Sequence, residues 1–177
     1  FSQSRNYIGI RSQLCVNFCS HVFIGVAMTI PKPSPSTESL TFAELGINSA
    51  LCSVLPAALK HPTRVQQLAI PAILAGRDVL ALSQTGSGKT LAFGLPLLQA
   101  IHQQLQQQVG LAGAESVPSL ASNAQALVLV PTRELAQQVT IALHGLASKL
   151  SYSLNIQLLC GGIAQEDQLA ELAAKPQ

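Results

Sequence analysis

A glycine-rich stretch that ends in lysine and threonine carries the strongest chemical signal in the chain. Residues 83–90 read SQTGSGKT and follow the short apolar run 78–82. Gly86 and Gly88 have no Cβ, so the backbone can curl with several N–H groups pointing inward around a phosphate. A helix that begins just after them adds its unsatisfied amides and the positive end of its dipole at the same point. This arrangement predicts a phosphate-binding loop.

The remaining residues of the stretch complete the loop. Lys89 supplies a positive charge to the β/γ oxygens of a nucleoside triphosphate, and the Thr90 hydroxyl is placed to hold Mg²⁺. Thr85 and Ser87 belong to the same cradle, while Ser83 replaces the first glycine of the stricter pattern, where a small residue should serve. The alternative is a glycine-rich turn without a ligand. The apolar run before the loop and the helical pattern after it favour nucleotide binding.

Composition limits the classes of function. The chain has 177 residues and 48% hydrophobic content, which suits one folded domain. Charged residues make up 10%, well below the ~25% of ordinary soluble domains, and the net charge of +2 is neither strongly basic nor acidic. Any contact with nucleic acid therefore has to be argued from local motifs.

Cysteine spacing favours a reducing compartment, and the expected location is the cytoplasm. Four cysteines, at positions 15, 19, 52 and 160, form no C-x-x-C pair and have no histidine at zinc-finger spacing. Free thiols in a reducing compartment are the expected state. No apolar run reaches the ~18 residues that a membrane-spanning helix needs.

The first part of the chain differs from the rest. Residues 1–40 contain three prolines among serines, and their basic residues have no acidic neighbour before residue 38. We expect a disordered extension and linker here, with 1–27 lying upstream of a natural start at Met28; a targeting peptide is the alternative. The fold should begin near Thr41, which gives a partial domain over 41–177.

Hydrophobic periodicity predicts alternating strands and helices after that point. Two helical stretches should precede the loop, over about 49–59 and 63–75. Thr63 is the expected N-cap of the second stretch, and Gly76 is expected to end it. Within that stretch, Pro71 is expected to start a separate short helix. Short apolar runs predict strands covered on both faces at 78–82, 125–131 and 154–160. Helical patterns follow them at about 89–108, 133–150 and 165–174, and the Gln-rich connection 102–125 reads as a helix end and surface loop. The order predicts an α/β domain with a parallel sheet flanked by helices.

Two longer segments around the loop resemble a known family. They read HPTRVQQLAIPAILAGRDVLALSQTGSGKTLAF (61–93) and LVLVPTRELAQQV (127–139). From about Thr41 to its end the chain strongly resembles the DEAD-box RNA helicases, most closely their bacterial RhlE-like branch. The resemblance implies the first RecA-like P-loop domain of such a helicase, present here in truncated form.

The resemblance places the family's Q motif on PTRVQ, residues 62–66. It implies that Gln66 recognises adenine, since a glutamine amide donates and accepts at once, and that Phe42 packs on the ring. ATP is then favoured over GTP. A surface glutamine and a core phenylalanine are the alternatives. Arg64 and His61 depart from the family's usual proline and lysine, but neither makes a proposed contact.

The resemblance also places motif Ia on PTRELA, residues 131–136. A strand that ends at Pro131 and a helix capped by Thr132 present free amides beside Arg133, a local site for one RNA phosphate. Glu134 in the first turn suits the helix dipole and is expected to orient Arg133. A well-formed helix start without a ligand is the alternative.

Two glycines after the third expected strand match a further family motif. Gly161 and Gly162 would let the RNA backbone approach closely, where a simple turn is the alternative. Contacts of this kind reach phosphates and 2′-hydroxyls, so the resemblance implies binding to RNA without sequence preference.

A catalytic acid is missing from the predicted site. A P-loop ATPase needs a carboxylate near Mg²⁺ at the end of a neighbouring strand. Asp78 opens the first strand, at its wrong end, and Asp167 lies in a polar helical stretch. In the family, the D-E-A-D box and the second RecA-like domain would follow Gln177.

We therefore expect the N-terminal part of an ATP-dependent RNA helicase that remodels short RNA duplexes, with ATP and Mg²⁺ as cofactors. The chain alone should not hydrolyse ATP. Family members act in ribosome assembly, RNA decay and cold adaptation, so partners from ribosome assembly or RNA decay are expected. The alternatives are another P-loop NTPase, such as a kinase or a DNA-dependent helicase, and a non-catalytic module that binds nucleotide or RNA.

Overall fold

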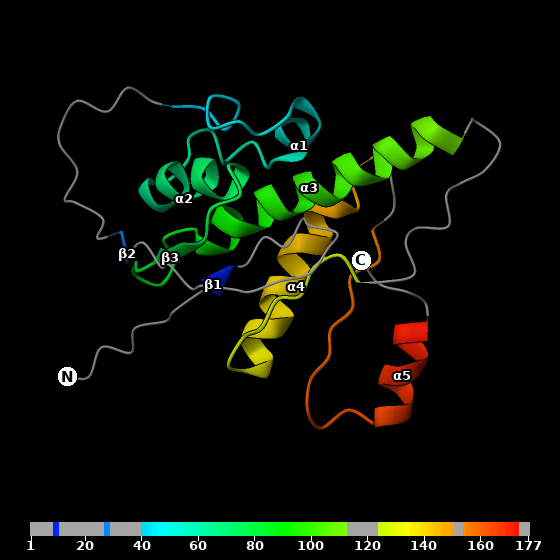
Figure 1. The fold of residues 1–177 in the computed structure, drawn as a ribbon. Helices are drawn as coiled ribbons and strands as arrows, with labels where there is room; N and C mark the ends of the chain where they lie inside the picture. Colours follow the sequence, from blue (N-terminus) through cyan, green and yellow to red (C-terminus); the bar gives the residue numbers. More distant parts are fainter. Residues whose placement is uncertain (1–8, 11–26, 29–39, 113–123, 151–153, 174–177) are drawn as a thin grey trace, which may run out of the picture. The chain divides into compact units, whose positions relative to one another are not determined.

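The structure, a computed structural model, divides into two compact units. It describes residues 9–10, 27–28, 40–112, 124–150 and 154–173 (Figure 1). The first unit comprises residues 1–52 and 56–96, and the second comprises residues 53–55 and 97–177. The phosphate loop and the predicted Q motif belong to the first unit. The predicted motif Ia and the glycine pair belong to the second.

Helix α1 is shorter than the sequence predicts. It spans Ser49–Val54, whereas periodicity extends the pattern to residue 59. Pro56 explains the early end, because the ring of a proline disfavours helical backbone at the preceding residue, here Leu55. The side chain of Leu51 is fully buried and anchors the helix to the core.

Helix α2 spans Arg64–Leu74 and begins, as predicted, at the N-cap Thr63. The prediction that Pro71 starts a second helix is wrong, because this residue lies inside the continuous α2. Proline removes one hydrogen bond to the preceding turn. Burial of the neighbouring Ile70 and Ala72 against the core stabilises the helix despite that loss.

The end of α2 confirms the predicted role of Gly76. Its φ of 72° lies in the left-handed region. The Gly76 amide donates to the carbonyl of Ile73 at 2.9 Å, and the Arg77 amide donates to that of Ala72 at 3.0 Å. These two bonds form a Schellman motif, which satisfies the last carbonyls of the helix and turns the chain toward the next strand.

The predicted first strand forms as β3, Val79–Ala81, at the centre of a small sheet. Strand β1 (Gly9–Ile10) pairs with it antiparallel and β2 (Ala27–Met28) pairs with it parallel, so the order is β1-β3-β2. Four residues of the extension predicted to be disordered thus take part in the sheet. The proline linker at 31–35 lies outside the described residues, and the domain boundary at Thr41 stays a prediction.

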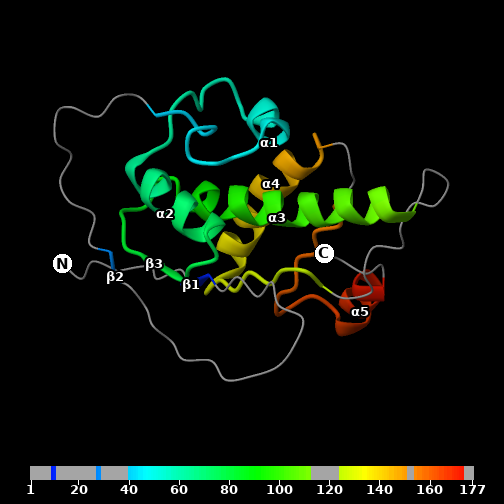
Figure 2. The same ribbon diagram turned by 45° about the horizontal axis from the view of Figure 1, so that its top comes forward.

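Helix α3 spans Lys89–Ala112 and leaves the first unit at Pro96. Helix α2 lies beside the first turns of α3 and packs on β3 (Figures 1 and 2). Among the described residues of the first unit, the buried side chains are apolar apart from Gln66. These buried side chains include Phe42, Ile47, Leu51, Val65, Ala69, Ile70, Ala92, Phe93 and Leu95.

The second unit contains the rest of α3, helix α4 (Arg133–Ala147) and helix α5 (Gln165–Ala173). The predicted helices at 133–150 and 165–174 are confirmed as α4 and α5, and α4 ends three residues earlier than predicted. In the described part of this unit the buried side chains are Leu98, Gln99, Ile101, His102, Leu105, Val139, Leu143, Leu146, Ala147 and Leu154.

The predicted second and third strands, 125–131 and 154–160, are not formed. In the described part of the chain neither segment belongs to a β-ladder. Leu127 and Leu129 are 79% and 83% exposed, so the expectation of burial on both faces is also wrong. A cavity of about 550 Å³ lies between these segments and helices α3 and α4. An apolar run is buried as a strand only where a neighbouring strand and a covering helix both meet it.

The Gln-rich connection is helical further than predicted, because α3 continues to Ala112. Residues 113–123 lie outside the described ranges. No helix in those ranges is long and apolar enough to cross a membrane.

Candidate functional site

The phosphate loop joins the end of β3 to the start of α3, as predicted. Gly86 and Gly88 have φ values of 78° and 89°, which L-residues with a side chain rarely adopt. The carbonyl of Gly88 accepts the amide of Ala92 at 3.1 Å, so Gly88 occupies the N-cap position of α3. Strand, glycine turn and helix start therefore have the order that a phosphate cradle needs.

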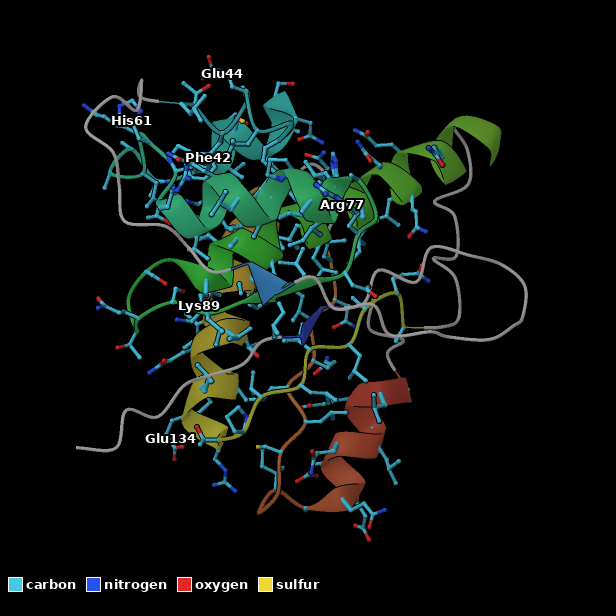
Figure 3. The ribbon with its side chains drawn as sticks, turned by 60° about the vertical axis from the view of Figure 1, so that its left-hand side comes forward. Phe42, Glu44, His61, Arg77, Lys89 and Glu134 are labelled. Carbon is cyan, nitrogen blue, oxygen red and sulfur yellow. The ribbon has the colours of Figure 1, made fainter. Side chains whose placement is uncertain are left out.

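Lys89 folds back onto this loop. Its Nζ donates to the carbonyl oxygens of Ser83 at 2.8 Å and Gln84 at 2.7 Å (Figure 3). The hydroxyls of Ser83 and Ser87 lie 2.7 Å apart and close the loop further. Partial burial lowers the pKa of Lys89 from its ordinary value. The ammonium group thus stands at the position from which it can reach a phosphate that enters the loop.

The predicted Q motif is bonded directly to the loop. Gln66 is 1% exposed, its Oε1 accepts the Thr63 amide at 2.8 Å, and its Nε2 donates to the carbonyl of Gly88 at 3.0 Å. The Thr63 hydroxyl donates to the carbonyl of Ser87 at 2.8 Å. A Cβ on Gly88 would collide with the Gln66 amide. Hydrogen bonds from the start of α2 therefore stabilise the phosphate loop.

The two predicted adenine contacts occupy different surroundings. Gln66 reaches the loop, whereas Phe42 is 4% exposed and lies apart from Lys89 in Figure 3. The Phe42 carbonyl accepts the Ile47 amide at 3.1 Å, and this bond fixes the backbone at Phe42. Contact of either side chain with adenine stays a prediction.

The hydroxyl residues of the loop are accessible. Thr85 is exposed and Thr90 is half-buried in the first turn of α3. Asp78 is exposed and precedes β3, so it lies at the opposite end of the strand from the loop, while Asp167 is exposed in the first turn of α5. The described residues contain no cluster of three His, Cys, Asp or Glu side chains that could hold a metal ion. The Mg²⁺ contact of Thr90 stays a prediction.

The predicted motif Ia forms the start of α4. Thr132 is its N-cap, and the Thr132 hydroxyl accepts the amide of Leu135 at 3.2 Å, as the sequence predicts. Pro131, Thr132 and Arg133 are all exposed. Glu134 lies in the first turn (Figure 3), and within the described part of the chain it forms no ion pair with Arg133. The expectation that Glu134 orients Arg133 therefore has no support in this geometry.

Arg133 instead contacts the glycine pair. Its Nη2 donates to the carbonyl of Gly161. Gly162 has a φ of 85°, and a Cβ there would collide with the Arg133 guanidinium. The predicted motif Ia and the glycine pair, which the sequence analysis gives as separate RNA contacts, are thus hydrogen-bonded to each other in the second unit.

Sequence reasoning missed one residue of this second site, Gln168 of α5. Its Oε1 accepts the Cys160 amide at 3.0 Å, and its Nε2 donates to the carbonyl of Ile163 at 3.2 Å. A single glutamine in a polar helix gives no sequence signal of its own. Only the return of α5 onto the preceding turn reveals the contact.

Comparisons with known proteins agree on one family. A model described as DEAD/DEAH box helicase matches residues 63–177. The ATP-dependent rRNA helicase RRP3 of Gibberella zeae is 40% identical over 137 residues, which cover 77% of this chain and 24% of that protein. The ATP-dependent RNA helicase DeaD of Mycobacterium tuberculosis is 40% identical over 146 residues, which cover 82% and 23%. The chain spans about a quarter of the length of these relatives.

Solved structures confirm the fold class, a RecA-like α/β domain. The RNA helicase Prp28 from Chaetomium thermophilum, bound to ADP, has a TM-score of 0.56 and 32% identity, covering 83% of this chain and 32% of its own. A DEAD box protein from the hyperthermophile Methanococcus jannaschii has a TM-score of 0.54 and 28% identity, covering 75% and 32%. Because the family model spans the phosphate loop, motif Ia and the glycine pair, the chain belongs to the DEAD/DEAH box helicase family.

Proposed function

We propose that the chain forms the N-terminal part of an ATP-dependent RNA helicase that remodels short RNA duplexes. The observation that carries this proposal is the hydrogen bond from Gln66 to the carbonyl of Gly88. It joins the predicted adenine-recognising residue to the predicted phosphate loop in one unit. The relatives named as ATP-dependent RNA helicases support the same reaction.

ATP binds, in this proposal, with its phosphates in the loop 83–90. Lys89 gives up its bonds to the carbonyl oxygens of Ser83 and Gln84 and bonds to phosphate oxygens instead. The negative charge of the phosphate then compensates the charge of the ammonium group. The Thr90 hydroxyl would hold Mg²⁺, which would supply positive charge to offset that of the phosphates. The ADP bound to the related Prp28 supports an adenine nucleotide.

RNA binds through its backbone at the second site. Free amides at the start of α4 and at the Gly161–Gly162 turn suit phosphate oxygens, and Arg133 adds a positive charge beside them. Such contacts do not read base edges, so every RNA sequence should bind with similar affinity.

Hydrolysis needs a carboxylate that the described residues do not place at the loop. Asp78 lies at the far end of β3, so we propose that the chain by itself binds ATP without turning it over. The free thiols of Cys52 and Cys160 suit a cytoplasmic protein, and partners from ribosome assembly or RNA decay fit the proposed activity.

Nucleotide affinity tests the proposal directly. Fluorescent ATP and GTP analogues are titrated into the unmodified chain, Lys89→Ala and Lys149→Ala. Lys149 is exposed in the second unit and matches the change in charge. We expect ATP to bind more tightly than GTP and Lys89→Ala alone to weaken both. Equal binding of both nucleotides would instead support a generic P-loop NTPase.

A further inference from the structure

Side chains from two helices form hydrogen bonds to the turn that carries the glycine pair. It connects the segment that ends at Cys160 with the start of α5 at Gln165 (Figures 1 and 2). Its sequence, Gly161 to Ala164, has no side chain able to fix the conformation from within. A turn with two adjacent glycines loses much conformational entropy on folding, so it needs support from outside.

Gln168 of α5 provides the first support. Its amide accepts from the Cys160 N–H and donates to the Ile163 carbonyl, at 3.0 and 3.2 Å. These two groups flank the glycine pair, so one side chain fixes both ends of the turn. Gln168 is half-buried, whereas the first residue of the same helix, Gln165, is exposed.

Arg133 of α4 provides the second support, through its bond to the Gly161 carbonyl. The carbonyl groups of Gly161 and Ile163 are therefore both occupied. By contrast, no described residue accepts a hydrogen bond from the amides of Gly161 and Gly162. The amides of the glycine pair thus stay available as donors while the carbonyls of Gly161 and Ile163 are engaged, and such a polarity suits an anion.

We infer that Gln168 is a positioning residue for RNA: together with Arg133 it holds the Gly161–Gly162 turn so that the free amides meet an RNA phosphate. The inference rests on the proposed function, because it assigns a role within the same RNA site. Gln168 itself touches no RNA. It acts through the backbone of Cys160 and Ile163, whose geometry fixes the direction of the glycine amides.

RNA affinity of four forms of the full chain tests this inference. Fluorescence anisotropy with a labelled single-stranded RNA is measured for the unmodified chain, Gln168→Ala, Gln168→Glu and the control Gln165→Ala. Gln168→Ala should bind RNA about tenfold more weakly, since it loses two hydrogen bonds of the turn. The salt dependence of binding should stay unchanged, because no charge is removed. ATP affinity should stay unchanged, and Gln165→Ala should behave as the unmodified chain.

Gln168→Glu separates positioning from a simple loss of stability. At pH ~7.5 its carboxylate can accept from the Cys160 amide but has no proton for the Ile163 carbonyl. Protonation near pH ~5 and below restores a donor. RNA affinity relative to the unmodified chain at the same pH should therefore recover in Gln168→Glu and stay low in Gln168→Ala. This comparison still decides the matter if Gln168→Ala is poorly folded.

Three results would overturn the inference, and they distinguish its failure from failure of the proposed function. If the unmodified chain binds RNA and Gln168→Ala binds equally well, or if Gln168→Glu shows no recovery at low pH, Gln168 does not position the turn, while the proposed function stands. If the unmodified chain binds no RNA, the proposed function fails and the inference fails with it.

Discussion

The side-chain amide of Gln66 donates to the carbonyl oxygen of Gly88 at 3.0 Å, across 22 positions of sequence. The same carbonyl accepts the amide of Ala92 in the first turn of α3. The residue predicted to recognise adenine and the predicted phosphate loop thus share one backbone group, the Gly88 carbonyl. A base that takes the Nε2 group of Gln66 as its donor must compete with Gly88, so binding of the base alters a contact of the phosphate loop.

Replacement of Gln66 by alanine should weaken ATP binding and abolish the preference for ATP. The variant loses the bonds to Thr63 and Gly88 and the group proposed to recognise adenine. Since a bidentate amide discriminates bases by roughly 1–3 kcal/mol, the ATP to GTP ratio should fall at least about tenfold. Competition titrations with both nucleotides measure it, with Gln138→Ala, an exposed site on α4, as the control. An unchanged ratio would remove Gln66 from the adenine site.

Gly88→Ala should damage the loop far more than an ordinary glycine replacement. Gly88 has a φ of 89°, which costs an L-residue roughly 1–2 kcal/mol, and the new Cβ would collide with Gln66. Gly145→Ala is the matched control, because Gly145 lies inside α4 and a Cβ there meets nothing within 4 Å. The control should gain up to about 1 kcal/mol from helix propensity. Thermal unfolding and ATP titration of both variants test the contrast; equal behaviour would contradict it.

Local signals in the sequence were sufficient for three of the helix ends and for the strand, turn and helix order of the phosphate loop. The cap at Thr63, the stop at Gly76 and the cap at Thr132 each depend on residues within one or two turns, so their chemistry is readable without the fold. Pro71 shows the limit of that reasoning. Its cost is local, but burial of Ile70 and Ala72 in the tertiary core outweighs it.

Contacts between distant segments could not be predicted in the same way. The runs 125–131 and 154–160 have the composition of buried strands, yet composition does not supply the neighbours that a sheet requires. Likewise the bonds of Arg133 to Gly161 and of Gln168 to its turn depend on how α4 and α5 return to one loop. Side-chain types alone do not encode that return.

Arg133→Ala should weaken RNA binding by a similar factor for every RNA sequence and leave ATP affinity unchanged. The guanidinium adds positive charge beside the α4 amides and holds the Gly161 carbonyl, and neither function reads a base. A loss of about tenfold is expected for one charge-assisted contact. Anisotropy with purine-rich and pyrimidine-rich single strands measures it, with Arg77→Ala, an exposed site of the first unit, as the charge-matched control. A changed order of preference among sequences would contradict the backbone role.

Loss of the Glu44 carboxylate should destabilise the chain at neutral pH and matter less in acid. Glu44 accepts from the Thr41 amide at 2.6 Å and from the Thr41 hydroxyl at 2.8 Å, and these bonds lower its pKa from the ordinary 4.5. A carboxylate whose pKa is lower in the folded state stabilises the fold above the unfolded-state pKa, and this contribution disappears as pH falls through the folded-state value. The unfolding temperature of Glu44→Gln should therefore lie below that of the unmodified chain at neutral pH, and the gap should close as the pH falls below the ordinary pKa of 4.5 and through the lowered folded-state pKa. Glu171→Gln, on exposed α5, controls for the lost charge. A gap that persists in strong acid would show that the Thr41–Glu44 bonds do not depend on the carboxylate charge.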